Sequence, residues 1–510
     1  MESLMNLSNC NELLFVAILL PLIISTFINH LVSEKKSVVG AKCSSFLTGI
    51  ALIIGLFTLF TNPSRSFTAN ELFSLSNLSF LTAALILFVS FVVHQFSKRY
   101  MDGDRHYCLY FRRLSLITLT ATVMAFANHL ILFWFAWFLS NILLVILMIH
   151  KTEWEAAKNS GILTMKILMP GSLALLLSFT LFYILTGSFS IESVNIQLKQ
   201  FDSPILTAAI LLVVFAAFTQ SAIWPFHRWL LSSLNSPTPV SALMHAGLVN
   251  GGGLLLVKFT PILIGDQAIL NLVFILGATT ASLGSLWKLI QNSIKRMLAC
   301  STMAQMGFMM MQCGLGLFPA AVAHLCWHGL FKSYLFLSSG SVVQQRRIET
   351  RFFSAKRFSL FFAMLGGLAS AFSFAMVTEK PIFPLQATSF LLVFTFMAGA
   401  QLSDTLIRAS NFKLMKLLVI MVSFLTGWLY GESIHLIEFF TGIATVQSTS
   451  LNGVQVIALI LFVTVWLTFN LRNYLQLEKT KLWAFIYTRM LNESQPHPKT
   501  ITTNRKTYQY

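Results

Sequence analysis

Charged side chains are scarce in this 510-residue chain, where Asp, Glu, Lys and Arg together make up 10% of the sequence. A soluble protein carries about 25%. Hydrophobic residues reach 56%, and the mean hydropathy is +0.73. These values exclude a soluble globular protein, a disordered chain and a disulfide-stapled secreted domain. The apolar runs are continuous over roughly 20 residues rather than alternating over about 10, which excludes a membrane β-barrel. The composition therefore predicts an all-α polytopic membrane protein.

Motifs that bind metals or cofactors are also missing. The six cysteines are scattered without a CxxC pair, so neither a structural zinc site nor an iron–sulfur cluster is predicted. The chain contains no GxGxxG or P-loop, so we expect no nucleotide or flavin. No Lys or Arg precedes Lys35, so the basic region that a secretory signal requires is missing. Residues 13–28 are therefore predicted to form a first transmembrane span.

The apolar segments predict about 15 transmembrane helices, with 13 as the lower bound. They cover residues 12–32, 44–62, 78–97, 114–127, 129–149, 161–185, 204–222, 238–262, 268–288, 297–316, 319–343, 358–377, 386–407, 417–432 and 453–471.

The distribution of basic residues predicts the topology. With the N-terminus outside, 28 of the 35 Lys and Arg residues fall on the cytoplasmic side and three on the other. This asymmetry follows the positive-inside rule and indicates an outer N-terminus and a cytoplasmic C-terminus. The topology accounts for the net charge of +17. We therefore expect the chain to contact membrane lipid and do not expect it to bind nucleic acid.

A few charged residues fall within the predicted spans. Lys288 lies at a span end, where its side chain can reach the interface. Lys166, Lys258 and Lys332 lie well inside, and a buried ammonium costs several kcal/mol, so they are predicted to face a protein or water-filled interior. Asp404 has Arg408 one turn away, which favours a salt bridge.

The sharpest pattern is His324–x3–His328–x3–Lys332. The spacing of four keeps all three residues on one helix face. Histidine exchanges protons near neutrality, and a desolvated lysine can also release one. The pattern therefore favours a proton relay through the membrane. The alternative is a set of buried polar groups that bond neighbouring helices, while zinc is disfavoured because Lys332 would repel it.

A second pattern covers residues 219–259. Pro225 is predicted to interrupt a span, while Pro237 and Pro239 open the next one. Gly251, Gly252 and Gly253 allow a bend or a close approach between helices. Interrupted helices line cavities at transport sites, so His245 and Lys258 in this segment are further candidates for proton transfer. They are thirteen residues apart and are not expected to touch.

Three stretches together resemble a known family. SPTPVSALMHAG (236–247), KRMLACSTMAQMGFM (295–309) and HLCWHGLFKSYLFLSSGSV (324–342) are similar to the antiporter-like proton-translocating proteins, which include chain 5 of respiratory complex I, the large Mrp subunits and DabB. The resemblance covers residues 100–345. By matching motif positions it implies proton-path roles for His245, His324, His328 and Lys332, and more loosely for Lys166.

The resemblance also implies an architecture. Two inverted five-helix repeats, each with a broken helix, would occupy residues 114–262 and 268–407. N-terminal transmembrane helices (1–113) and C-terminal ones (408–472) would flank them. A cytoplasmic amphipathic helix and a polar tail would follow at 473–510.

Two departures from the family pattern narrow the functional expectation. Phe138 stands where complex I and Mrp subunits carry a glutamate, and Gln220 where they carry a lysine. These changes disfavour a redox-coupled or Na⁺/H⁺-exchanging subunit, although that alternative stays open, as does a non-conducting membrane anchor. The sequence SAIWPFHRWLLSSLNSPTPVSALMHAGLVNGGGLLL looks like the DabB branch. That branch implies a non-enzymatic, proton-conducting subunit of a bacterial inner-membrane complex that accumulates inorganic carbon, with zinc held by a DabA-type partner.

Two cytoplasmic segments are candidates for docking that partner. The loop 344–357 is basic, and residues 473–491 have an amphipathic pattern that also suits an interfacial helix. The last 17 residues are polar and are predicted to be disordered.

Overall fold

The computed structural model describes residues 2–61, 67–69, 71–343, 359–379, 386–409, 415–442, 451–475 and 480–501. Its contacts divide the chain into two compact units. Unit 1 comprises Met1–Gly314, His324–Gly340 and Arg489–Tyr510, and unit 2 comprises Leu315–Ala323 and Ser341–Thr488.

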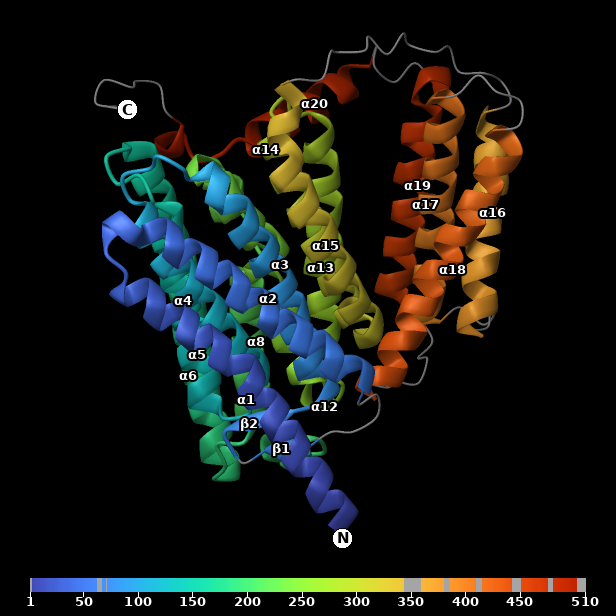
Figure 1. Ribbon diagram of the computed structural model, residues 1–510. Helices are drawn as coiled ribbons and strands as arrows, with labels where there is room; N and C mark the ends of the chain where they lie inside the picture. The colour runs from blue at the N-terminus through green and yellow to red at the C-terminus, as the bar shows by residue number, and fades with distance from the viewer. Residues whose placement is uncertain are drawn as a thin grey trace. The chain divides into compact units, whose positions relative to one another are not determined.

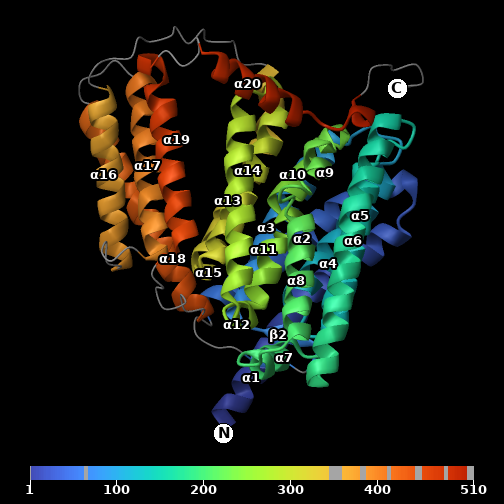
Figure 2. The ribbon, with the colours of Figure 1, turned by 180° about the vertical axis from the view of Figure 1, so that it is seen from behind.

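Unit 1 is a bundle of helices (Figures 1 and 2). Its longer helices are α1 (Glu2–Leu31), α2 (Ser37–Thr61), α3 (Asn77–Tyr100), α4 (Tyr107–Phe126), α5 (Leu130–Met148), α6 (Glu155–Thr186), α8 (Pro204–Gln220), α13 (Gln267–Leu289), α14 (Ile294–Gly314) and most of α15 (Phe318–Ser338). Shorter helices are η1 (Glu34–Lys36), α7 (Ile191–Leu198), α9 (Arg228–Leu231), η2 (Ser233–Asn235), α10 (Thr238–Ala246), η3 (Leu248–Asn250), α11 (Gly251–Lys258), α12 (Thr260–Leu263) and η6 (Pro498–Thr500).

Unit 2 contains α16 (Ser359–Thr378), α17 (Ala387–Ala409), α18 (Met415–Thr441), α19 (Gly453–Leu475), the 3-10 turn η4 (Ser339–Val343) in its larger part, and the first residues of α20 (Lys481–Glu493). Small residues let its helices approach closely. The hydroxyls of Ser403 and Ser423 are 2.8 Å apart, and the Ser373 hydroxyl donates to the Phe424 carbonyl at 2.8 Å. The predicted ion pair is confirmed, with 2.7 Å between Arg408 Nε and Asp404 Oδ2.

The prediction of a multi-pass, α-helical membrane protein is confirmed. Each of the fifteen predicted spans coincides with helical structure, and in the described residues eleven helices are long and apolar enough to cross a membrane. Pro204–Gln220 and Gly453–Thr468 are shorter apolar helices, and α14 and α15 have 21 residues each. The count of fifteen crossings stays a prediction.

One small β-hairpin departs from the all-α expectation. Strand β1 (Phe67–Ala69) pairs antiparallel with β2 (Phe73–Leu75). The Phe73 ring packs 4.8 Å from that of Phe15 in α1. The Ser76 hydroxyl then accepts from the Ser79 amide at 3.2 Å and caps α3. The hairpin therefore connects α2 to α3 at one end of unit 1.

Glycines allow a close contact between α13 and α14 in unit 1. A Cβ placed on Gly277 of α13 would lie 2.8 Å from the Gly307 carbonyl of α14, so these two backbones touch directly. α13 to α17 each continue without an internal break in the described residues. The broken helix expected within 268–407 is therefore not found there, while the two repeats themselves stay a prediction.

The tail differs from its prediction. The amphipathic helix is α20, which begins at Lys481 rather than 473, because α19 continues to Leu475. Residues 494–501, predicted to be disordered, bind the end of unit 1 opposite the start of α1 (Figure 1). The Ser494 hydroxyl accepts from Gln291 at 2.8 Å, and Asn235 donates to the Thr500 carbonyl at 2.8 Å. The basic loop 344–357 lies outside the described residues.

Candidate functional site

The three predicted relay residues of α15 form one row, in which His324 is half-buried and the other two are buried. The His324 and His328 rings lie 6.0 Å apart with an interplanar angle of 14°. His328 is 5% exposed, and its two ring nitrogens have no hydrogen-bond partner in the described part of the chain. Lys332 is 0% exposed, and its ammonium is 3.4 Å from the Leu298 carbonyl of α14. The residues of this row can exchange protons, and few of their polar atoms have a hydrogen-bond partner in the described residues.

His245 joins this row from another helix. It lies in α10, is 1% exposed, and stacks on Phe336 of α15 with 4.3 Å between the ring centroids. Lys332 and His328 are both within electrostatic range of His245. Four residues predicted from separate motifs therefore come together; we call His245, His324, His328 and Lys332 the relay cluster.

The helix that carries His245 is broken within unit 1, as predicted. α10 ends at Ala246, and the turn η3 separates it from α11, which packs beside α8 and α14 (Figure 2). Neighbouring side chains satisfy the carbonyls that the break exposes. Gln220 donates to the Leu248 carbonyl at 3.1 Å, and Ser221 donates to that of Val249 at 2.8 Å. An interruption at depth is tolerated when its backbone groups are bonded in this way.

The prolines lie where the sequence placed them. Pro237 precedes α10, and Pro239 lies in its first turn, where a missing amide hydrogen costs little. Pro225 lies between α8 and α9, in a turn where Ala222 has a φ of +52°. Trp229 fixes this second interruption, because its indole donates to the Thr219 carbonyl at 3.0 Å.

The three glycines lie just after the break rather than in it. A Cβ on Gly251 would contact Gln220 and Trp137 at 3.4 and 3.5 Å. A Cβ on Gly252 would collide with the Ala217 carbonyl and the Ser221 hydroxyl of α8, and one on Gly253 would collide with Met309 of α14. The glycines therefore permit the close approach that lets α8 satisfy the break.

We expect Gly252→Val to destabilise the protein, because the added atoms collide with backbone that cannot move aside. Overpacking of this kind costs about 1–3 kcal/mol. Thermal unfolding of the detergent-solubilised protein measures the effect. Gly340→Ala is the matched control, because a Cβ there meets no atom within 4 Å. Equal melting temperatures for both variants would contradict the tight contact with α8.

Two predicted lysines lie apart from the relay cluster. Lys258, at the end of α11, is half-buried; it donates to the Ala127 carbonyl at 3.2 Å and lies 5.8 Å from the Phe133 ring centroid. Lys166 is exposed on α6. Within the described residues Lys166 is not enclosed by this chain, and its place in a protein or water-filled interior stays a prediction.

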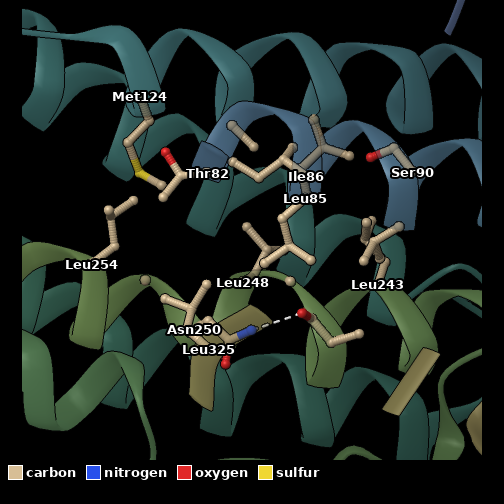
Figure 3. A pocket seen from close by; sticks show the side chains of 16 residues that line it. Thr82, Leu85, Ile86, Ser90, Met124, Leu243, Leu248, Asn250, Leu254 and Leu325 are labelled. Atoms are coloured by element: carbon tan, nitrogen blue, oxygen red, sulfur yellow. Dashed lines mark hydrogen bonds between the residues drawn. The ribbon is translucent and has the colours of Figure 1, made fainter. Parts of the chain in front are cut away.

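A small cavity adjoins the break. It has a volume of about 50 Å³ and is lined from α3, α4, α10, α11 and Leu325 of α15. Most of its wall is apolar, but Thr82, Ser90 and Asn250 are present, and Asn250 bonds back to the Ala246 carbonyl at 2.8 Å (Figure 3). Sequence reasoning missed this cavity and the neighbouring His94; an imidazole inside the predicted span 78–97 was the available signal.

Comparison with known proteins places these features in one family. Residues 127–407, which contain the whole relay cluster, match the family described as NADH:quinone oxidoreductase/Mrp antiporter, TM. The chain belongs to this family. Residues 62–111 also match the NADH-ubiquinone oxidoreductase (complex I) chain 5 N-terminus.

Two relatives and one solved structure show how far the likeness extends. The chain is 38% identical over 276 residues to a probable inorganic carbon transporter subunit DabB1 of Halothiobacillus neapolitanus, covering 53% of this chain and 49% of that protein. The chain thus matches about half the length of that relative. A probable DabB of Bacillus anthracis is 31% identical over 446 residues, 84% of each chain.

The Mrp complex from Dietzia sp. supports the fold. The match covers 98% of this chain and 61% of the matched chain of that complex, with a TM-score of 0.63 and 18% sequence identity.

Proposed function

We propose that this chain is the proton-conducting membrane subunit of an energy-coupled complex that accumulates inorganic carbon. The observation that carries the proposal is the relay cluster, in which three buried titratable residues and the half-buried His324 lie on two helices beside a helix break. In this reading the N-terminus is outside and the C-terminus cytoplasmic, so Lys332 lies on the cytoplasmic side of His328 and His324. Protons pass along this row, and no other chemistry takes place in the chain.

The ring geometry favours conduction over a purely structural role. Polar groups that hold membrane helices together do so by bonding across the interface. Both nitrogens of His328 lack such a bond in the described residues, and leaving a buried polar atom unpaired costs about 1–3 kcal/mol. A neutral imidazole can accept a proton at one nitrogen and release one from the other. An unbonded ring in this position therefore suits transfer better than anchoring.

The carbon-linked branch is favoured over the respiratory one by the residues at the break. A lysine in the position of Gln220 would need a nearby carboxylate, and Phe138 occupies the place of that carboxylate. Here the Gln220 amide holds the Leu248 carbonyl, and the Phe138 ring stacks on Trp134 at 5.2 Å. A proton-translocating subunit of complex I or of an Mrp-type antiporter remains the second candidate, because the family match includes both.

The proposed partner is a DabA-type zinc protein in the cytoplasm, where CO₂ hydration would take place on the partner's metal. α20 offers a surface for it, because Leu482 is 67% exposed and Phe485 is 63% exposed. An interfacial helix would bury the same side chains in lipid headgroups. The complex would reside in the bacterial inner membrane, with the zinc in the partner and no cofactor in this chain.

Co-expression of the chain with such a zinc protein is expected to let a bacterium that lacks carbonic anhydrase grow in air. Such cells depend on added CO₂ because they cannot make bicarbonate fast enough. Either protein alone should fail, because the membrane half supplies energy and the soluble half supplies hydration. Growth with the zinc protein alone would contradict the proposal. So would failure of the pair when both proteins are made and co-purify.

A further inference from the structure

A second line of buried polar groups begins at a surface loop of unit 1, apart from the relay cluster. Asp104 lies between α3 and α4, and His150 follows α5. The His150 Nε2 is 3.0 Å from Asp104 Oδ1, with side chains 0% and 18% exposed. The other nitrogen of His150, Nδ1, has no partner in the described residues. One end of this pair therefore meets solvent and the other points into the protein.

The electrostatics of the pair suit proton capture. Burial would raise the pKa of Asp104, but hydrogen bonds from the His106 backbone and the His150 ring outweigh it and lower that pKa. Burial also lowers the pKa of His150, against the opposing effect of Asp104. At neutral pH a carboxylate thus faces a neutral imidazole, whose Nε2–H donates and whose Nδ1 is open. Asp104 then stabilises the imidazolium whenever Nδ1 takes a proton.

Hydroxyl groups continue the line toward the interior. The Tyr110 ring of α4 meets the His150 ring edge-on, with 5.5 Å between centroids. The Tyr110 hydroxyl bonds the Ser97 hydroxyl of α3 at 2.9 Å, and both residues are 0% exposed. Either oxygen can be the donor in this bond. Such a pair passes a proton by reversing its direction, without moving a heavy atom.

The line ends at the cavity beside the helix break. His94 lies one turn before Ser97 on α3, and its Nδ1 is 2.7 Å from the Ser90 carbonyl. The Ser90 side chain lines the cavity together with Asn250 (Figure 3). From Ser97 to Ser90 the helix rises about 10 Å. The cavity also touches Ala246, the residue next to His245.

Unpartnered atoms follow this line. In the part of the chain that the structure describes, His150 Nδ1, His94 Nε2, Ser90 Oγ and Asn250 Oδ1 are buried without a hydrogen bond. Burying a polar atom without a hydrogen bond is unfavourable, so atoms of this kind mark positions of ordered water. A water molecule needs about 10–15 Å³ of accessible space, and the cavity provides about 50 Å³.

We propose that these residues form a hydrated proton path that connects the cytoplasmic surface with the helix break. The path, here called the α3 path, consists of Asp104, His150, Tyr110, Ser97, His94 and Ser90. It rests on the proposed function, since it supplies protons to, or collects them from, the relay cluster. At His150, burial and the charges of His106 and Arg113 lower the pKa and oppose a resting proton. A proton therefore moves on rather than staying.

Proton flux in liposomes that contain the purified full-length chain, together with its partner where the two co-purify, tests the path. Tyr110→Phe keeps the ring and removes only the hydroxyl. It is expected to reduce the flux by about tenfold or more, since a positioned proton-transfer group commonly contributes about 10²–10⁴-fold. His94→Gln is expected to have a similar effect. Tyr107→Phe is the matched control, because the ring of this α4 tyrosine packs against Phe111, with 4.9 Å between centroids, outside the path, and we expect the variant to retain the flux.

The outcomes separate this inference from the proposed function. Wild-type flux in Tyr110→Phe and His94→Gln, while Lys332→Met abolishes it, would overturn the α3 path and leave the relay cluster in place. Absence of proton flux in the wild type would overturn both. If a variant fails to fold, a high-resolution density map of the native protein decides. Water density beside His94 Nε2 and Ser90 Oγ supports the path, and empty space there overturns it.

Discussion

Replacing Lys332 with methionine is expected to abolish proton translocation without destabilising the protein. Methionine keeps an unbranched chain of similar length but cannot carry a proton. The side chain is fully buried, and its ammonium has only a long contact of 3.4 Å to the Leu298 carbonyl. Removing an ammonium that burial disfavours and that no carboxylate pairs is commonly neutral or stabilising. The expected signature is therefore complete loss of flux at an unchanged or higher melting temperature.

Flux into liposomes and thermal unfolding, measured on the same preparation, give both halves of this result. Lys158→Met is the matched control, because Lys158 is an exposed lysine at the start of α6. His328→Phe should behave like Lys332→Met, since it preserves an aromatic ring but removes both nitrogens. If Lys332→Met unfolds the protein, the ammonium is structural. If it conducts at the wild-type rate, proton transfer does not use the α15 row.

The sequence predicted the relay cluster because its members repeat at helical spacing or lie in recognisable motifs. A period of four on one apolar helix places His324, His328 and Lys332 on a common face, whatever the rest of the fold does. Pro237 and the glycines indicated an irregular helix near His245, but the interruption itself lies between them, at η3. The spacing of residues along the sequence could not predict which side chain each of these four residues contacts. That His245 meets Phe336 follows from the packing of two helices about ninety residues apart.

The features that the sequence did not predict have one physical origin. A span is recognised by its hydropathy, which does not say which face of the helix meets the protein. Hydropathy therefore placed Lys166 in a span without predicting that α6 exposes it in this chain. The tail was judged by its polarity, but residues 494–501 are held by hydrogen bonds to Gln291, Arg296 and Asn235, which no local pattern reveals. The α3 path escaped notice for the same reason, because its residues come from two helices and two loops.

Collapse of the proton gradient is expected to stop inorganic carbon accumulation, whereas removal of NADH and quinol is not. In the redox-coupled relatives, a glutamate and a lysine near the break link proton transfer to electron transfer. Here the corresponding residues are Phe138, which stacks on Trp134, and Gln220, which bonds the Leu248 carbonyl. Neither side chain can carry a charge, so the glutamate–lysine link of those relatives cannot form at these two positions. A proton gradient is therefore the expected source of energy.

Membrane vesicles from cells that express the chain with the proposed zinc partner allow each energy source to be applied alone. A pH step imposed without NADH should drive carbon accumulation, and a protonophore should remove it completely. An ionophore that collapses only the sodium gradient should leave accumulation unchanged, which separates this mechanism from Na⁺/H⁺ exchange. Vesicles that carry Lys332→Met should show no response to the pH step, which ties the effect to the relay cluster rather than to leakage. Accumulation that survives the protonophore, or that appears only when NADH is supplied, would show that protons crossing this chain do not provide the energy.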